Sequence, residues 1–230
     1  MFNFSKTWAI ALAGGIIPSL AWLWFWLKED QKKPEPKGVL VICFVLGMIA
    51  VILVLPIQKF IQGMVSSNEL QIIGWAGAEE IIKYLAVMVI LYKTTYIDEP
   101  LDWPIYFITT ALGFAALENT LFLIKPLSLD QATVSLLTGN LRFLGATLLH
   151  TVASGTIGIA MGLSFFMDGF RKKVYVLVGF IVAITLHSVF NFFIMRNDGG
   201  DFLTVFSFLW VVTIIIMLLF EKIRRMSGDN

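Results

Sequence analysis

The chain has 230 residues, of which 58% are hydrophobic and only 14% are charged, and its mean hydropathy is +0.83. An ordinary soluble domain is roughly half apolar and about a quarter charged, so this composition excludes that class and indicates an integral membrane protein. The formal net charge of +1 argues against a nucleic-acid-binding protein, because scattered loop lysines provide no basic face for a phosphate backbone.

Seven stretches of the chain are long and apolar enough to cross a membrane as helices. A helix needs about 20 mostly apolar residues to span about 30 Å of hydrocarbon. The stretches are 8–27, 38–58, 72–92, 104–124, 141–167, 174–195 and 202–220. The connections between them are too short to bury a core of their own. The sequence therefore predicts an all-α polytopic membrane protein, a bundle of about seven transmembrane spans that forms a single domain over residues 1–230.

The first two stretches have the pattern of membrane helices that each contain a proline. Pro18 interrupts the first stretch, which continues through three tryptophans at 22–26, a pattern typical of the membrane–water interface. We therefore interpret it as a retained span and not as a signal peptide. The second stretch is expected to end near Pro56, and it contains Cys43, the only cysteine, which excludes a disulfide within the chain.

The third stretch carries Glu79, Glu80 and Lys83 where a membrane-spanning helix should be apolar. A charged group near the centre of the bilayer costs about 2.5–3.5 kcal/mol even on the lowest scale, so such a cluster indicates a functional site. Glu79 and Lys83 are four residues apart and share a helix face. We therefore expect Lys83 to be the counter-charge that keeps Glu79 ionised.

Three of the four remaining stretches also contain polar side chains in apolar surroundings. They are Phe114, Glu118 and Asn119 in the fourth stretch, His150 and Ser154 in the fifth, and His187 and Asn191 in the sixth. A spacing of four residues places Phe114 with Glu118, and each histidine with its downstream polar residue, on one helix face. The fifth stretch also has three glycines at 155–162, which favour close helix packing. The seventh stretch is uniformly apolar.

The Lys and Arg residues are divided unevenly between the two sides of the membrane. One side receives eleven of them, Lys28, Lys32, Lys33, Lys37, Lys93, Arg171, Lys172, Lys173, Lys222, Arg224 and Arg225, and the other receives five, Lys6, Lys59, Lys125, Arg142 and Arg196. Cytoplasmic loops carry the excess of positive charge. The sequence therefore predicts an N-terminus outside the cell and a C-terminus in the cytoplasm.

The two histidines and three of the carboxylates lie at a similar depth along their helices. At about 1.5 Å per residue, Glu79, Glu80, Glu118, His150 and His187 fall within roughly 9–14 Å of the outer boundary. Groups in one layer can pair with one another, which reduces the cost of burying each of them. We therefore expect a single polar cluster in the outer half of the membrane.

Together these side chains could hydrolyse an amide bond with water. A carboxylate can act as general base, imidazoles can bind a metal or shuttle protons, and an amide can stabilise an oxyanion. Taken singly, a membrane histidine or Asn119 can simply join two helices. Two other functions remain open, a proton- or cation-coupled transporter and an inactive protein that only binds membrane helices. The sequence has no internal repeat of the kind that builds many transporters.

Four short motifs follow one another along the chain. They are EExxK at Glu79–Lys83, FxxxE at Phe114–Glu118, a histidine motif at His150–Ser154 and HxxxN at His187–Asn191. In this order they resemble the motifs of the PrsW family of intramembrane proteases. The related CAAX prenyl endopeptidases are similar but have arginine after the acidic pair and histidine in place of Glu118. Lys83 and Glu118 therefore favour the PrsW family, and an inactive relative is disfavoured because all motif residues are present.

The resemblance implies the cleavage of a single-pass membrane protein near the outer face of a bacterial plasma membrane. In this family such a reaction is the first cleavage of an anti-sigma factor in stress signalling. The expected partners are therefore a single-pass substrate, such as an anti-sigma factor, and the lipid bilayer, with no nucleic acid.

Two mechanisms remain open at this stage. In the first, Zn²⁺ is bound with an open fourth position, and Glu79 or Glu80 accepts the proton of the attacking water. The zinc ligands would be Glu118, His150 and His187. In the second, Glu79 activates water without a metal, while His187 and Asn191 stabilise the oxyanion. In both mechanisms the supporting residues are Lys83, Phe114, Asn119 and Ser154.

Overall fold

The computed structural model of the protein describes all residues except 1–3, 29–32, 92–93, 129–144, 197–201 and 229–230. Within the described residues the chain forms seven α-helices and no β-strand, which confirms the expected all-α class. The helices are α1 (Phe4–Leu27), α2 (Lys37–Met64), α3 (Asn68–Leu91), α4 (Asp102–Ser128), α6 (Thr147–Leu163), α7 (Gly169–Arg196) and α8 (Phe202–Gly228).

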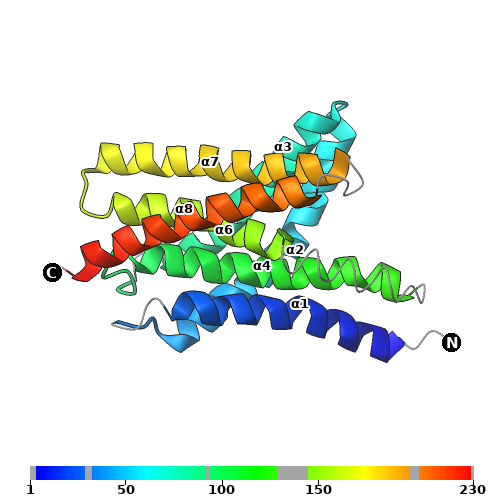
Figure 1. Ribbon diagram of the computed structural model, residues 1–230, viewed down its shortest axis with the longest axis horizontal. Helices are drawn as coiled ribbons and strands as arrows, with labels where there is room; N and C mark the ends of the chain where they lie inside the picture. The colour runs from blue at the N-terminus through cyan, green and yellow to red at the C-terminus, as the bar shows by residue number, and fades with distance from the viewer. Residues whose placement is uncertain (1–3, 29–32, 92–93, 129–144, 197–201, 229–230) are drawn as a thin grey trace.

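Five of these helices, α1, α2, α4, α7 and α8, are long and apolar enough to cross a membrane. Helix α3 has sufficient length but contains three buried charged residues, and α6 has 17 residues. Figure 1 shows the helices alternating in direction along one axis, with the two chain ends at opposite ends of the bundle. The protein is therefore a multi-pass membrane protein, as expected. Which end faces the cytoplasm stays a prediction.

Several helices extend beyond their expected boundaries. Helix α2 continues past Pro56 to Met64, α4 includes Pro126, and α8 continues through the charged tail to Gly228. Proline removes a backbone donor and usually bends or ends a helix, but membrane helices tolerate it where other groups satisfy the freed carbonyl. Positions 92 and 141–144 of the expected spans lie outside the described residues, and positions 164–167 form a turn after α6.

Helix α4 lies at the centre of the bundle, where it packs against α1, α2, α3 and α6. Its closest contact with α2 depends on two glycines. A Cβ atom on Gly113 would lie 1.9 Å from the carbonyl oxygen of Phe44, and one on Gly47 would lie 2.0 Å from that of Thr110. The two backbones therefore touch, which is how helices in lipid gain packing energy. This contact fixes the position of α2 relative to α4.

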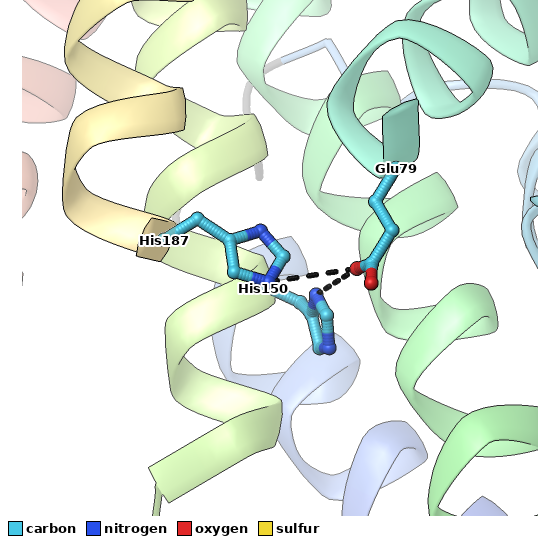
Figure 2. A group of neighbouring side chains, drawn as sticks. All are labelled: Glu79, His150 and His187. Carbon is cyan, nitrogen blue, oxygen red and sulfur yellow. Dashed lines mark ion pairs between the residues drawn. The ribbon is translucent and has the colours of Figure 1, made fainter. Parts of the chain in front are cut away.

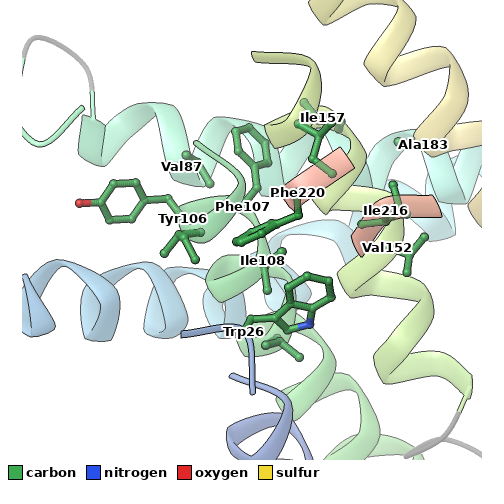
Figure 3. Close-up of a cluster of buried hydrophobic side chains, with 14 of the residues drawn as sticks. Trp26, Val87, Tyr106, Phe107, Ile108, Val152, Ile157, Ala183, Ile216 and Phe220 are labelled. Carbon is green, nitrogen blue, oxygen red and sulfur yellow. The ribbon is translucent and has the colours of Figure 1, made fainter. Parts of the chain in front are cut away.

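The apolar core gathers aromatic side chains around α4. Trp26 of α1, Phe107 of α4 and Phe220 of α8 are each at most 2% exposed, and Figure 3 shows them together with aliphatic side chains of α3 and α6. Large apolar side chains such as Val89 and Leu203 instead point outward and are more than three-quarters exposed. Facing lipid costs these side chains little, because the lipid tails are equally apolar.

A group of buried polar side chains surrounds the start of α4. The Asp102 carboxylate accepts hydrogen bonds from the backbone N–H groups of Asp98 and Glu99, both at 2.8 Å, and thereby closes the loop before the helix. One turn later, the Tyr106 hydroxyl donates a hydrogen bond to the carboxylate of Glu35. Glu35, Glu99 and Asp102 are all less than 8% exposed. These contacts join the segment before α2 to the beginning of α4.

Candidate active site

Helix α3 carries three charged side chains into the interior of the bundle. Glu79, Glu80 and Lys83 are 3%, 0% and 0% exposed. Burial costs an isolated ion several kcal/mol, so each of these groups requires partners. Consecutive residues in a helix point about 100° apart, so the two glutamates meet different neighbours. Those neighbours come from α2, α4, α6 and α7, and the site is therefore built by five helices.

Glu80 has a full set of hydrogen-bond donors. Its Oε1 lies 2.5 Å from Lys83 Nζ and 2.8 Å from His187 Nδ1, and its Oε2 accepts a hydrogen bond of 2.6 Å from Ser154 Oγ. The sequence predicted that Lys83 pairs with Glu79. In the structure Lys83 instead forms its ion pair with Glu80. The i,i+3 spacing is as close on a helix surface as the i,i+4 spacing, so the alternative pairing is sterically equivalent.

Glu79 has one bonded oxygen and one that lacks a donor. The side chain of Gln58, on α2, donates a hydrogen bond of 2.8 Å to Glu79 Oε1. Glu79 Oε2 has no hydrogen-bond partner among the described residues. It lies 3.5 Å from His187 Nε2 and 3.9 Å from His150 Nδ1, and Figure 2 shows both rings directed toward it. The unbonded carboxylate oxygen therefore faces the two imidazoles.

The His150 ring connects this group to α4. Its Nε2 lies 3.1 Å from Glu118 Oε2, and its Nδ1 lies 3.3 Å from Lys83 Nζ. The Phe114 ring packs against both His150 and Lys83. Its centroid lies 5.1 Å from the centroid of the His150 ring and 4.8 Å from Lys83 Nζ. The Glu118 side chain is 20% exposed, whereas those of Glu79 and both histidines are at most 4% exposed. Among these residues Glu118 is therefore the most accessible from outside the cluster.

The hydrogen bonds define which ring nitrogens are free to bind another group. A lysine ammonium can only donate, so His150 Nδ1 is an acceptor and the N–H at Nε2 donates to Glu118. The N–H at His187 Nδ1 donates to Glu80, which leaves the lone pair of Nε2 directed toward Glu79. The lone pair of His187 Nε2 and the Glu79 Oε2 atom thus face each other, and a cation between them would remove their mutual repulsion. To bind His150 Nδ1 as well, the cation would have to displace the Lys83 donor.

This arrangement fits a metal ion. Ligand atoms of Glu79, His150 and His187 lie within 4.8 Å of one another, and all three residues are buried. The set differs from the one expected from the sequence, because Glu79 takes the place of Glu118. Glu118 instead bonds the other nitrogen of His150, as Glu80 bonds the other nitrogen of His187. A carboxylate on the distal nitrogen of a histidine is the usual support of a metal-binding imidazole.

Two further residues were predicted for the site, Asn119 and Asn191. Asn119 donates a hydrogen bond of 2.9 Å to Thr147 and thereby joins α4 to α6. Asn191 is half-buried one turn after His187, and no hydrogen bond joins it to the site histidines or carboxylates in the described part of the chain. Its predicted oxyanion role stays a prediction.

Gln58 is the site residue that the sequence reasoning missed. It lies at the expected end of the second span, two residues after Pro56, where a polar side chain is ordinary. No signal in the sequence pointed to it, because the span was expected to end near Pro56. In the structure α2 continues for six residues past Gln58, which is half-buried and contacts Glu79.

Comparison with known proteins gives consistent matches. A family model described as PrsW family intramembrane metalloprotease matches residues 35–220, most of the chain. The protease PrsW of Geobacillus kaustophilus is 25% identical over 225 residues, which are 94% of this chain and 92% of that protein. Those of Bacillus subtilis and Oceanobacillus iheyensis are 26% and 27% identical, over 86% and 88% of this chain and 90% and 92% of their own lengths. No solved structure matches the chain significantly.

Proposed function

Because the chain belongs to the PrsW family of intramembrane metalloproteases, we propose that it cleaves a single-pass membrane protein near the outer membrane face. An anti-sigma factor, cleaved first at this site during stress signalling, is the substrate that we propose. The observation that carries the proposal is the buried cluster in which Glu79 Oε2 faces His150 and His187. Peptide hydrolysis in a membrane needs such a site, where water can be activated away from bulk solvent.

We further propose that Glu79, His150 and His187 hold Zn²⁺. When bound, this ion would supply Lewis acidity and would lower the pKa of a water molecule. The side chains then have distinct tasks. Glu80 orients the His187 ring, and its three donors leave it poorly suited to accept a further proton. Glu118 orients the His150 ring from the exposed side of the cluster.

Glu118 is the carboxylate that we assign as proton acceptor for the attacking water in the metal-dependent mechanism. It contacts the ligand residue His150 without belonging to the ligand set, and its side chain, at 20% exposed, is more accessible than those of Glu79 and Glu80. In the metal-free mechanism this task falls to Glu79, because its Oε2 has no donor among the residues described. The two mechanisms thus assign the base to different helices.

The activity is best tested by comparing membrane proteomes of cells that produce the wild-type protein, Glu79→Gln or Glu69→Gln. Glu69 is an exposed carboxylate at the start of the same helix and serves as the matched control. We expect at least one single-pass protein to be shortened by the wild-type and Glu69→Gln proteins and to remain intact with Glu79→Gln. If all three proteomes are identical, the proposed peptidase activity is wrong.

The mechanism is tested on the purified protein by elemental analysis and chelator treatment. With zinc as cofactor, a chelator should abolish cleavage and added Zn²⁺ should restore it. At saturating Zn²⁺, Glu118→Gln should then lose at least about 100-fold in kcat, the usual size of a general-base effect. Because Glu118 also supports the His150 ring, its zinc affinity should weaken by about 10–100-fold. A metal-free preparation with full activity would instead exclude the metal-dependent mechanism and leave Glu79 as the base.

A further inference from the structure

Gln58 determines the direction of the Glu79 carboxylate. Its Nε2 donates the only hydrogen bond that this carboxylate receives from the described residues, and the bond goes to Oε1. A carboxylate is planar, so fixing one oxygen restricts where the other can point. The other oxygen, Oε2, is the one that faces His150 and His187. The residue that holds Oε1 therefore controls the geometry of the reacting group.

The backbone of Gln58 is itself held in place. Trp75, on α3, donates a hydrogen bond of 3.0 Å from its indole nitrogen to the carbonyl oxygen of Gln58. Earlier in α2, the contact between Gly47 and α4 fixes the helix against the centre of the bundle. The amide is thus positioned by two neighbouring helices before it meets Glu79. Because its backbone is fixed in this way, the Gln58 amide stays in place and can hold the Glu79 carboxylate in one orientation.

We propose that Gln58 is a positioning residue of the active site, which aims Glu79 Oε2 at the gap between His150 and His187. The inference rests on the proposed function, because it assigns Gln58 a role in that chemistry. A neutral amide suits the position because it donates without adding positive charge. A lysine or arginine at this point would compete with a cation for the same carboxylate.

The test uses two substitutions of Gln58 in the full-length protein. Gln58→Leu removes the donor and retains similar volume, whereas Gln58→Glu retains the shape and presents an oxygen in place of the amide nitrogen. Loss of a residue that orients a metal ligand typically costs about 10–100-fold in activity or metal affinity. We therefore expect both variants to lose about 10–100-fold in kcat, with KM changed by less than about twofold. Zinc affinity, measured by competition with a chelator, should weaken by a similar factor.

Gln71→Leu is the matched control. It removes a side-chain hydrogen bond of 2.6 Å from α3 to the carbonyl oxygen of Val65 at the end of α2, and it touches neither Gln58 nor Glu79. If Gln58 only ties the two helices together, Gln71→Leu should lose as much activity as Gln58→Leu. If Gln58 only fills space, Gln58→Leu, which has a similar volume, should match the wild type. We expect neither result, and either one would overturn the positioning role.

The outcomes separate this inference from the proposed function. If the wild type cleaves its substrate and Gln58→Leu cleaves it equally well, the peptidase assignment stands and the role of Gln58 is refuted. A wild-type protein that cleaves no membrane protein refutes the peptidase assignment. In that case the zinc measurement still tests whether Gln58 orients Glu79, because equal zinc affinity in Gln58→Leu and wild type would refute it.

Discussion

Replacing Glu80 with glutamine should destabilise the protein far more than replacing Glu79 with glutamine. The Glu80 carboxylate is 0% exposed and accepts hydrogen bonds from Lys83, Ser154 and His187. Glutamine retains the shape but leaves the buried lysine ammonium without its counter-charge, which costs about 3–5 kcal/mol. Glu79→Gln changes a carboxylate that receives one hydrogen bond, and the loss of one such bond costs about 1 kcal/mol.

Thermal unfolding in detergent, followed by the fluorescence of the seven tryptophans, measures this difference. For a chain of this length, 1 kcal/mol shifts Tm by about 2–4 °C, so Glu80→Gln should melt roughly 6–20 °C below the wild type. The double variant Glu80→Gln/Lys83→Met removes both charges and should recover at least half of this loss. If Glu80→Gln and Glu79→Gln melt within about 2 °C of each other, the buried ion pair does not stabilise the fold as argued.

The α2–α4 contact and the polar group at the start of α4 give two further expected outcomes. Gly113→Ala should cost about 1–3 kcal/mol in the same unfolding assay, because its Cβ would meet the backbone of Phe44. Gly63→Ala, which meets no atom within 4 Å, is the control and should be neutral or slightly stabilising. Burial, with the nearby Asp102 carboxylate, raises the pKa of Glu99, so the fold loses stability as pH rises above the ordinary glutamate pKa of about 4.3. Glu99→Gln should therefore raise Tm at pH 7 and leave it unchanged below about pH 4, and an equal shift at both pH values would contradict this.

The helix class and the polar layer could be predicted because both follow from distance along a helix. Apolar length decides whether a segment can cross the membrane. The rise of about 1.5 Å per residue then gives the depth of each polar side chain. Glu118, His150 and His187 were expected at one depth, and the structure brings them into one cluster with the two glutamates.

The pairing within the cluster could not be predicted, because it depends on how each helix is rotated about its axis. Lys83 can reach either glutamate from its position on α3, and the location of α7 decides which of them also receives His187. The rotation of α2 is equally hidden, since Pro56 suggested a helix end and gave no reason to follow the chain to Gln58. Sequence spacing thus indicates which residues meet in a layer, whereas side-chain direction decides the partners.

The long separation between Glu80 and His187 has a consequence for biosynthesis. The two residues are 107 positions apart in the chain, and at about 5–20 residues per second the ribosome needs roughly 5–20 s to connect them. During this interval the charged residues of α3 exist without α7, the helix that supplies one of the partners of Glu80. The contact between Glu80 and His187 therefore cannot form until most of the polypeptide has been made.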